Sequence, residues 1–394
     1  MSSSAGEAVA RFEALLSGTG QELLAVLRDE PSGPDAGLRL GTRLRARYPA
    51  ALVADALTQH ELRLAARTKF SRAMEMYFTR PGLEQASAEV VAGYRAHRYR
   101  EAGRLADLCC GIGGDLLALA AGHQVLAVDS DPLHLRIARA NAEVLGVAGN
   151  VTTLAADVRD AGLDEVAAVF IDPARRTGRG RLRTGVSEPP LEWCLGLAGR
   201  VDRVGIKAAP GLPRDAVPGG WELEFIAVGR DLKEAVAWSP ALATAATRAT
   251  ILPAGHTLTP QPGPPVEVRE PGEYLFDPSP AVTRAGAVAD LARLLAAWQI
   301  DEQIAFLSAD TRASTPFART LRVIDSAPWN QKQLPARLRG LGIGAVDIRR
   351  RGLAGDTERL HRSLRLSGSR RATLVMTRVR DRPWGLVCVD VPER

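Results

Sequence analysis

The part of the sequence best suited to chemistry is a glycine-rich segment that begins and ends with an aspartate. Residues 107–115 read Asp-Leu-Cys-Cys-Gly-Ile-Gly-Gly-Asp. Glycine is needed where a backbone approaches a ligand closely or where φ must be positive. Leu116 stands where a dinucleotide-binding fingerprint requires its third glycine, and no Gly-Lys-Ser/Thr sequence of a phosphate-binding loop follows. Asp107 can bind a ligand ammonium and would repel a pyrophosphate.

Three further aspartates each follow an apolar run that is typical of a strand. Asp129 comes 18 residues after Gly111, and an acid at the end of a second strand commonly binds ribose hydroxyls. Asp157 and Asp172 follow the next two apolar runs. The alternative interpretations are structural: a plain strand-to-helix turn at the glycines, and an ordinary helix cap at Asp129.

Hydrophobic periodicity predicts the elements that position these residues. From about residue 104, short β-like runs alternate with helical ones, which indicates right-handed βαβ units and a parallel sheet. We expect strands at 104–108, 124–128, 151–154, 166–171 and 201–206, and helices at 115–121 and 132–145. Three more strands are expected to form an antiparallel edge, at 223–228, 235–238 and 249–252. The fold class is therefore α/β.

The chain divides into four regions of different composition. Residues 1–100 show helical periodicity and are predicted to form a helical domain. The α/β domain just described spans residues 101–258. The proline-dense stretch 259–280 has the composition of an extended linker. Residues 281–394 are predicted to form a second α/β domain, which ends in a hairpin of two strands joined near residues 380–383.

Composition excludes several classes of protein. Of the 394 residues, 46% are hydrophobic and 24% are charged, which excludes a wholly disordered chain. No apolar run reaches the roughly 18 residues that span a bilayer. Four cysteines without a Cys-x-x-Cys spacing indicate neither a disulfide framework nor a metal site. The N-terminus lacks a basic segment before an apolar stretch, so we expect a cytoplasmic protein with no membrane partner.

The net charge of +6 is unevenly distributed. Residues 281–394 hold 20 Lys and Arg against 11 Asp and Glu, a balance of +9, and the remainder is slightly acidic. Only four basic residues are lysines, an arginine bias that a GC-rich genome would produce. The charge distribution therefore favours a nucleic-acid partner more than the arginine count does. The densest arginines are Arg349, Arg350, Arg351, Arg359, Arg362, Arg365, Arg370 and Arg371. A solvated helical face is the alternative interpretation.

Taken together, the motifs resemble class I S-adenosylmethionine-dependent methyltransferases over about residues 100–230, which implies a Rossmann-like fold. The resemblance implies that Asp107, Gly111 and Gly113 face the methionine part of the cofactor. It also implies that Asp129 binds the ribose and that Asp157 reaches the adenine amine. The full set of residues expected around S-adenosylmethionine is Phe78, Ser87, Asp107, Cys109, Gly111, Gly113, Asp115, Asp129, Ser130, Asp157, Val158 and Asp172. As alternatives, Phe78 would be a core residue and Cys109 a small buried hydrophobe.

Two groups within this family are most similar. The loop at 107–115 resembles that of trimethylguanosine synthases, which run Asp-x-x-Cys-Gly-x-Gly-Gly-Asn. Nearly the whole chain resembles a bacterial group with a C-terminal THUMP-like domain, and we prefer this second resemblance. Its hallmarks are similar to residues 273–278, 314–318, 348–352 and 372–378.

Residues 172–175, Asp-Pro-Ala-Arg, are predicted to form the end of the site that binds the methyl acceptor, here called the acceptor end. Methyltransferases that act on exocyclic amines typically show Asp/Asn-Pro-Pro-aromatic there, so Asp172 and Pro173 match and the next two positions do not. Arg175 would stack on a base, contact a phosphate or lie in solvent. Lys207 is expected at the carboxyl end of a strand, where it would face substrate or lie on the surface. Uridine C5 methylation is disfavoured, because Cys194, the nearest cysteine, is expected in a helix core.

The resemblance implies that the protein is an S-adenosylmethionine-dependent methyltransferase, and the THUMP-like segment implies an RNA substrate, tRNA above all. We expect the basic C-terminal domain to bind RNA and Asp172, Pro173, Arg175 and Lys207 to form the catalytic set, without a metal. The alternatives are a methyltransferase acting on a small molecule or protein, and a catalytically weak RNA-binding protein.

Overall fold

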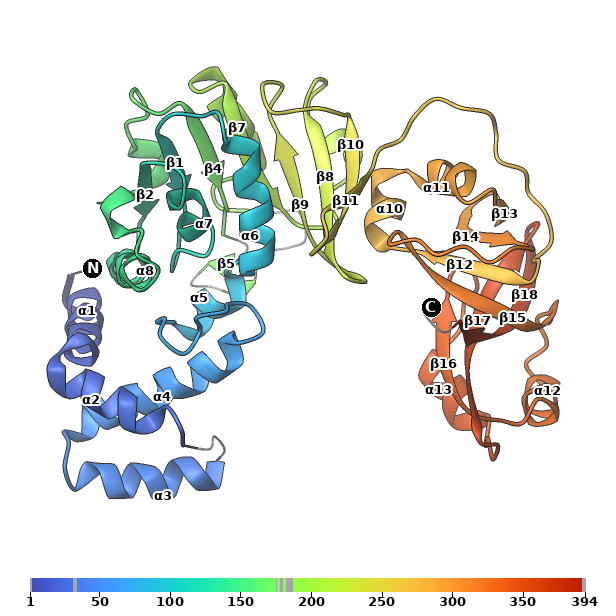
Figure 1. Ribbon diagram of the computed structural model, residues 1–394, viewed down its shortest axis with the longest axis horizontal. Helices are drawn as coiled ribbons and strands as arrows, with labels where there is room; N and C mark the ends of the chain where they lie inside the picture. The colour runs from blue at the N-terminus through green and yellow to red at the C-terminus, as the bar shows by residue number, and fades with distance from the viewer. Residues whose placement is uncertain (1, 31–33, 175, 178–179, 182–186, 392–394) are drawn as a thin grey trace. The chain divides into compact units, whose positions relative to one another are not determined.

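The structure is a computed structural model that describes residues 2–30, 34–174, 176–177, 180–181 and 187–391 (Figure 1). The chain forms two compact units. The first comprises Met1–Glu222 with Ala235–Thr244, and the second comprises Leu223–Glu234 with Ala245–Arg394. The boundary passes through the strand β9 (Asp231–Trp238).

Helices form the start of the first unit, as predicted. They are α1 (Ser2–Leu16), α2 (Gly18–Leu27), α3 (Pro34–Arg45), α4 (Ala50–Ala66), α5 (Arg80–Gln85) and α6 (Glu89–Ala96). Ser17 caps α2 by accepting a hydrogen bond from the Gly20 amide, and Leu23 and Leu27 are fully buried on its apolar face. Helix α1 contacts α2, α4 and the later helix α8 (Pro132–Val144), so the helical region packs onto the domain that follows it.

Five parallel strands follow, and all five match strands predicted from the sequence. They are β1 (Leu105–Leu108), β2 (Val125–Asp129), β3 (Val151–Ala155), β4 (Ala168–Ile171) and β7 (Arg203–Ala208). Their order is β7-β4-β1-β2-β3. The helices α7 (Leu116–Ala120) and α8 connect consecutive strands, as expected. The chain order reverses between β1 and β4, and in open sheets ligands bind beyond the carboxyl ends of the strands at such a switch point.

The expected antiparallel edge is only partly present. Strand β9 pairs antiparallel with β7, but β10 (Thr247–Leu252) pairs parallel with β8 (Glu222–Val228). The prediction of an antiparallel β10 was wrong because β10 lies next to β8, two strands back in sequence, rather than next to β9. A short strand, β11 (His256–Leu258), then returns antiparallel to β10.

The second unit also contains a seven-stranded mixed sheet. Its strands are β12 (Tyr274–Pro278), β13 (Trp298–Asp301), β14 (Ile304–Ala309), β15 (Ala318–Pro328), β16 (Ile343–Arg350), β17 (Arg370–Val379) and β18 (Arg382–Asp390). Their order is β13-β14-β12-β15-β18-β17-β16. Because β12 pairs with both β14 and β15, the proline-dense linker ends before Tyr274 rather than at residue 280. The predicted hairpin is confirmed, with Arg380 and Asp381 at positive φ in its two-residue turn.

Four helices accompany this sheet: α10 (Pro280–Ala285), α11 (Val288–Leu294), α12 (Leu334–Gly340) and α13 (Thr357–Ser363). Helices α12 and α13 contact the edge strand β16 and bury Leu334, Leu338 and Leu360 against it. They therefore cover one face of the sheet near its edge. Across both units, none of the helices in the described ranges combines the length and apolar content needed to cross a membrane.

Candidate active site

A cavity of about 650 Å³ lies at the switch point between β1 and β4 in the first unit. The segment that follows β1 forms its floor, and α5 with the residues after it forms a wall. Most of the residues predicted around a cofactor or acceptor line it: Asp107, Cys109, Gly111, Asp115, Asp129, Ser130, Asp157, Val158, Asp172 and Pro173. Residues spread over positions 107–173 thus meet in one cavity, as the parallel sheet requires.

The glycine loop has the backbone conformations that its sequence predicts. Gly111 and Gly113 have positive φ values of 54° and 94°. Cys109 has a φ of 60°, a backbone conformation that residues other than glycine rarely adopt. A Cβ atom on Gly113 would lie 3.4 Å from Ala138, so this glycine lets the loop pack against α8. Gly113 itself is not among the residues that line the cavity.

Asp107 is the most unusual group of the cavity. Only 1% of it is exposed, and within the described residues neither carboxylate oxygen has a hydrogen-bond partner. Burial, together with the charges of Asp115 and Asp172, raises the pKa of Asp107 well above its ordinary value. Buried polar groups are nearly always paired in folded proteins. A buried carboxylate that faces a cavity without a partner is suited to a cationic ligand group such as an ammonium.

Asp129 is held differently, by backbone amides. Its Oδ2 accepts from Gly111 N at 2.8 Å and its Oδ1 from Asp131 N at 2.9 Å. The His134 ring lies nearby, with Nδ1 3.9 Å from Oδ1. Burial acts to raise the pKa of Asp129, but His134 and the two amides outweigh it and hold the pKa below its ordinary value. Asp129 is therefore an oriented acceptor for a ligand hydroxyl.

The far side of the cavity is formed by the start of a short helical turn and by residues beyond β4. Asp157 caps the turn Val158–Asp160, accepting from Arg159 N at 2.9 Å. The Arg159 side chain forms ion pairs with both Asp157 and Glu188. Glu188 is joined to Ala174 by two backbone hydrogen bonds, and both residues line the cavity.

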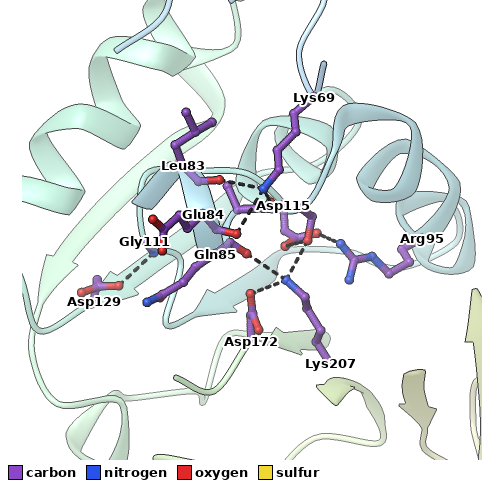
Figure 2. A network of polar contacts seen from close by, with 12 residues as sticks. Lys69, Leu83, Glu84, Gln85, Arg95, Gly111, Asp115, Asp129, Asp172 and Lys207 are labelled. Carbon is purple, nitrogen blue, oxygen red and sulfur yellow. Dashed lines mark hydrogen bonds and ion pairs between the residues drawn. The ribbon is translucent and has the colours of Figure 1, made fainter. Parts of the chain in front are cut away.

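A chain of polar contacts links Asp172 to the interior of the unit (Figure 2). The Lys207 ammonium donates to Asp172 Oδ2 at 2.6 Å and to Ser87 Oγ at 2.9 Å. Ser87 in turn donates to Asp115 Oδ2 at 2.9 Å, and Arg95 forms an ion pair with Asp115. Arg95 is almost fully buried and its guanidinium stacks on the Phe170 ring at 4.7 Å. Two acids and two bases therefore alternate along one network.

Several predicted site residues do not line the cavity. Phe78 lies in the helical core against Phe70, which agrees with the alternative interpretation made from sequence. Ser87 and Lys207 lie behind the cavity, where burial leaves them to hold other residues rather than a ligand. Lys207 is not a surface lysine. Arg175 lies outside the described residues.

Other lining residues were missed by the sequence analysis. Glu84 and Gln85 at the end of α5 and Ala86 after it form one wall, and none of the three was named as a site residue. His134 had a usable signal, because it stands five residues after Asp129 at the start of a helix. Arg159 and Glu188 reach the cavity only through tertiary contacts.

The thiols near the site are not activated. Burial raises the pKa of Cys109 far above its usual range, and it raises the pKa of Cys194 to about 12. Both cysteines are therefore neutral and poorly nucleophilic. Within the described residues, no three His, Cys, Asp or Glu side chains are arranged to hold a metal ion.

The parallel sheet, the glycine loop and the aspartates at three strand ends define a class I S-adenosylmethionine-dependent methyltransferase. Two proteins of Mycobacterium tuberculosis, from strains CDC 1551 and H37Rv, are each described as an uncharacterised S-adenosylmethionine-dependent methyltransferase. Each is 36% identical to this chain over 310 residues, which cover 77% of this chain and 84% of the relative. The chain belongs to this family of methyltransferases, and S-adenosylmethionine is its cofactor.

Family models match three separate segments. The RNA cap guanine-N2 methyltransferase family matches residues 102–181, the THUMP domain-like family matches residues 318–389, and a domain of unknown function matches residues 8–66. A crystal structure described as a candidate methyltransferase from Porphyromonas gingivalis W83 has the same fold. It superposes with a TM-score of 0.74 over 95% of this chain and 99% of its own, at 21% identity.

Proposed function

We propose that this methyltransferase methylates a base in RNA and that its RNA substrate is tRNA. The observation that carries the proposal is the position of Asp172, which follows β4 and lines the cavity, in a chain that also contains a THUMP-like segment. The match of residues 102–181 to an RNA cap guanine-N2 methyltransferase family supports a nucleotide substrate. A tRNA substrate would place the protein in the cytoplasm.

The cofactor fits the unpaired carboxylate. S-Adenosylmethionine supplies an electrophilic methyl group when it is bound. Asp107 would hold the ammonium of its methionine part, which would give the buried carboxylate the partner that it lacks. Asp129, fixed by two amides, would accept the ribose hydroxyls, with Ser130 beside it. Asp157 and Val158 would contact the adenine.

Asp172 would then orient the acceptor. Its Oδ2 is engaged by Lys207, so Oδ1 can accept a hydrogen bond from an amine of the target base. That bond would direct the nitrogen lone pair toward the methyl group and hold the proton that the nitrogen must lose. Orienting two reactants in this way is the main contribution an enzyme makes to a displacement reaction. Lys207 is a positioning residue in this scheme, and it fixes Asp172 before the substrate arrives.

Only part of the C-terminal arginine cluster is available to bind RNA. Arg349 and Arg351 form ion pairs with the buried Asp277, and Arg371 pairs with Asp347. The exposed arginines of the predicted cluster that have no carboxylate partner within the described residues are Arg350, Arg359, Arg362, Arg365 and Arg370. We propose that these five, around α13 and the ends of β16 and β17, bind the phosphates.

The charge proposal predicts different behaviour for paired and unpaired arginines. The variant R359Q/R362Q/R365Q should bind tRNA with a salt dependence reduced by about two to three phosphate contacts. The matched variant R319Q/R337Q/R371Q removes the same net charge from arginines that pair with Asp390, Asp325 and Asp347. It should keep the wild-type slope. Equal slopes for the two variants would show that net charge alone, not this surface, governs binding.

Nucleoside mass spectrometry of RNA from a strain that lacks the gene tests the reaction itself. One methylated nucleoside should disappear, and it should return with the wild-type gene but not with D172A. An unchanged nucleoside profile, together with no transfer of labelled methyl from S-adenosylmethionine to purified tRNA, would contradict the proposal. Methyl transfer to a protein or small molecule would identify the other substrate class.

A further inference from the structure

Lysine is rare in this chain, yet two of its four lysines contact the same short segment. The chain has 51 Lys and Arg, of which only Lys69, Lys207, Lys233 and Lys332 are lysines. Lys69 follows α4 and Lys207 lies on β7, and both ammonium groups bind the segment 83–87 (Figure 2). This segment contains Glu84, Gln85 and Ala86, which form the wall of the cofactor cavity.

The Lys69 ammonium donates to three backbone carbonyls. Its Nζ donates to Leu83 O at 2.7 Å, to Ala86 O at 2.9 Å and to Glu84 O at 3.2 Å. These carbonyls belong to the last turn of α5 and to the residue that follows it, where a helix leaves acceptors without partners and carries partial negative charge. A compact ammonium directs three donors from one nitrogen toward converging oxygens, whereas a guanidinium is bulkier and spreads its donors in one plane.

The wall held by Lys69 packs directly against the glycine loop. A Cβ atom on Gly114 would lie 3.1 Å from Ala86 Cβ and from Ser87 N, and a Cβ atom on Gly82 would lie 2.6 Å from the Ile112 side chain. A Cβ atom on Gly82 would force its neighbours to shift, and one on Gly114 would require Ala86 and Ser87 to move by a few tenths of an ångström. Glu89, which lies just after the wall, is also bonded to the chain around Lys69. Glu89 N donates to Lys69 O, and Ser71 donates to the Glu89 carboxylate.

We propose that Lys69 is a positioning residue for the cofactor. Its ammonium holds the carbonyls at the end of α5, and this keeps Glu84, Gln85 and Ala86 close to the glycine loop that binds S-adenosylmethionine. Without the ammonium, three carbonyls of like polarity lose their common donor and the wall moves away from the loop. Lys207 holds the other end of the same segment through Gln85 O and Ser87 Oγ.

The test measures cofactor binding in the absence of any methyl acceptor. By isothermal titration calorimetry with S-adenosylhomocysteine, K69R and K69A should each bind about tenfold more weakly than the wild type. n-Propylammonium supplies the three carbons and the ammonium that K69A lacks, so it should restore the affinity of K69A. It should not change the affinity of K69R or of the wild type. The control K332R alters an exposed lysine and should bind normally.

Two outcomes would overturn the proposal. One is a wild-type affinity in K69R, because a guanidinium would then serve as well as an ammonium. The other is a K69A protein that unfolds at a lower temperature but binds S-adenosylhomocysteine with wild-type affinity, because Lys69 would then contribute to stability alone. If K69A does not fold, K69R retains the bulk and charge of the side chain and decides the question by itself. A failure of the proposed RNA reaction would leave these binding results unaffected.

Discussion

The two ends of the cavity hold their carboxylates in different ways. At the cofactor end, Asp107 is buried and has no partner within the described residues, whereas at the acceptor end Asp172 is bound by the Lys207 ammonium. An unpaired buried carboxylate is unfavourable until a cation reaches it, so we propose that the ligand itself supplies the missing partner at this end. A paired carboxylate is already oriented, so the acceptor end is organised before its ligand binds. The comparison predicts that substitutions at the two ends change different properties.

The largest effect is expected at Asp107. D107N keeps the shape of the side chain but removes the charge, so S-adenosylhomocysteine should bind on the order of 1,000-fold more weakly. The ligand-free variant should be at least as stable as the wild type, because no partner is lost and a buried charge is removed. Calorimetry and thermal unfolding measure the two properties. A D107N protein that is clearly less stable without ligand would show that Asp107 already has a partner in the free protein.

The opposite result is expected at the acceptor end. K207M leaves the Asp172 carboxylate without its ammonium, and it should destabilise the free protein by about 3 kcal/mol. Adding D172N to K207M should recover at least 1 kcal/mol of that loss, because the isolated charge is then removed. Denaturant unfolding of the two single variants and the double variant measures this coupling. Additive losses would mean that the ion pair does not organise the acceptor end.

The two ends of the cavity also differ in how well the sequence predicted them. At the cofactor end, sequence predicted that Asp107, Gly111 and Asp129 lie together, because they stand at strand ends whose positions follow from local hydrophobic patterns. Phe78 and Ser87 were also expected there but do not line the cavity, and the contacts of the whole set with the cofactor stay a prediction. The acceptor end was only outlined: Asp172 was found, but its link to Lys207 joins two strands and was not. Lys69 and Arg95 were missed for the same reason, since their partners are carbonyls and carboxylates brought close by tertiary packing.

The same limit applies to the second unit. The hairpin β17–β18 follows from adjacent sequence, and it was predicted. Strand β12 was assigned to a linker, because its partners in β14 and β15 lie 31 or more residues further along the chain and its flanking prolines suggested an extended segment. The parallel pairing of β8 with β10 was missed for a similar reason. Local periodicity predicts which residues form strands, but not which strands become neighbours.

The pH dependence of cofactor binding distinguishes the two ends further. Because burial and nearby acids raise the pKa of Asp107, this carboxyl is protonated more readily in the ligand-free protein than in an unfolded chain. An ammonium binds only the carboxylate form, so affinity for S-adenosylhomocysteine should fall about tenfold per pH unit below that raised pKa. The stability of the ligand-free protein should change in the opposite direction. Asp107 should make the free energy of unfolding decrease as pH rises from about 4 toward its raised pKa.

Binding measured by calorimetry at several pH values, and repeated in D107N, checks this dependence. Arg95, Asp115, Asp129 and Asp172 also face Asp107 or influence its charge, and they remain in the variant. D107N should therefore lose most of the decline at low pH. If the variant retained the full decline, proton binding at another group would explain it, and His134, which lies beside Asp129, would be the first candidate.

The smallest effect is expected at the cysteines. If the acceptor end acts through the hydrogen bond of Asp172 rather than through a covalent bond to the base, no thiolate is required. The pKa of Cys194 is raised to about 12 by burial, so its thiolate is scarce at neutral pH, and within the described residues its sulfur donates only to Pro189 O. C194A should therefore transfer methyl groups to RNA within about twofold of the wild-type rate, since a buried cysteine acts mainly as a small apolar side chain. Two results would contradict this prediction: a loss of activity in C194A without a loss of stability, or a covalent protein–RNA adduct that forms with the wild type but not with C194A. Either result would indicate nucleophilic catalysis by Cys194 instead of hydrogen bonding by Asp172.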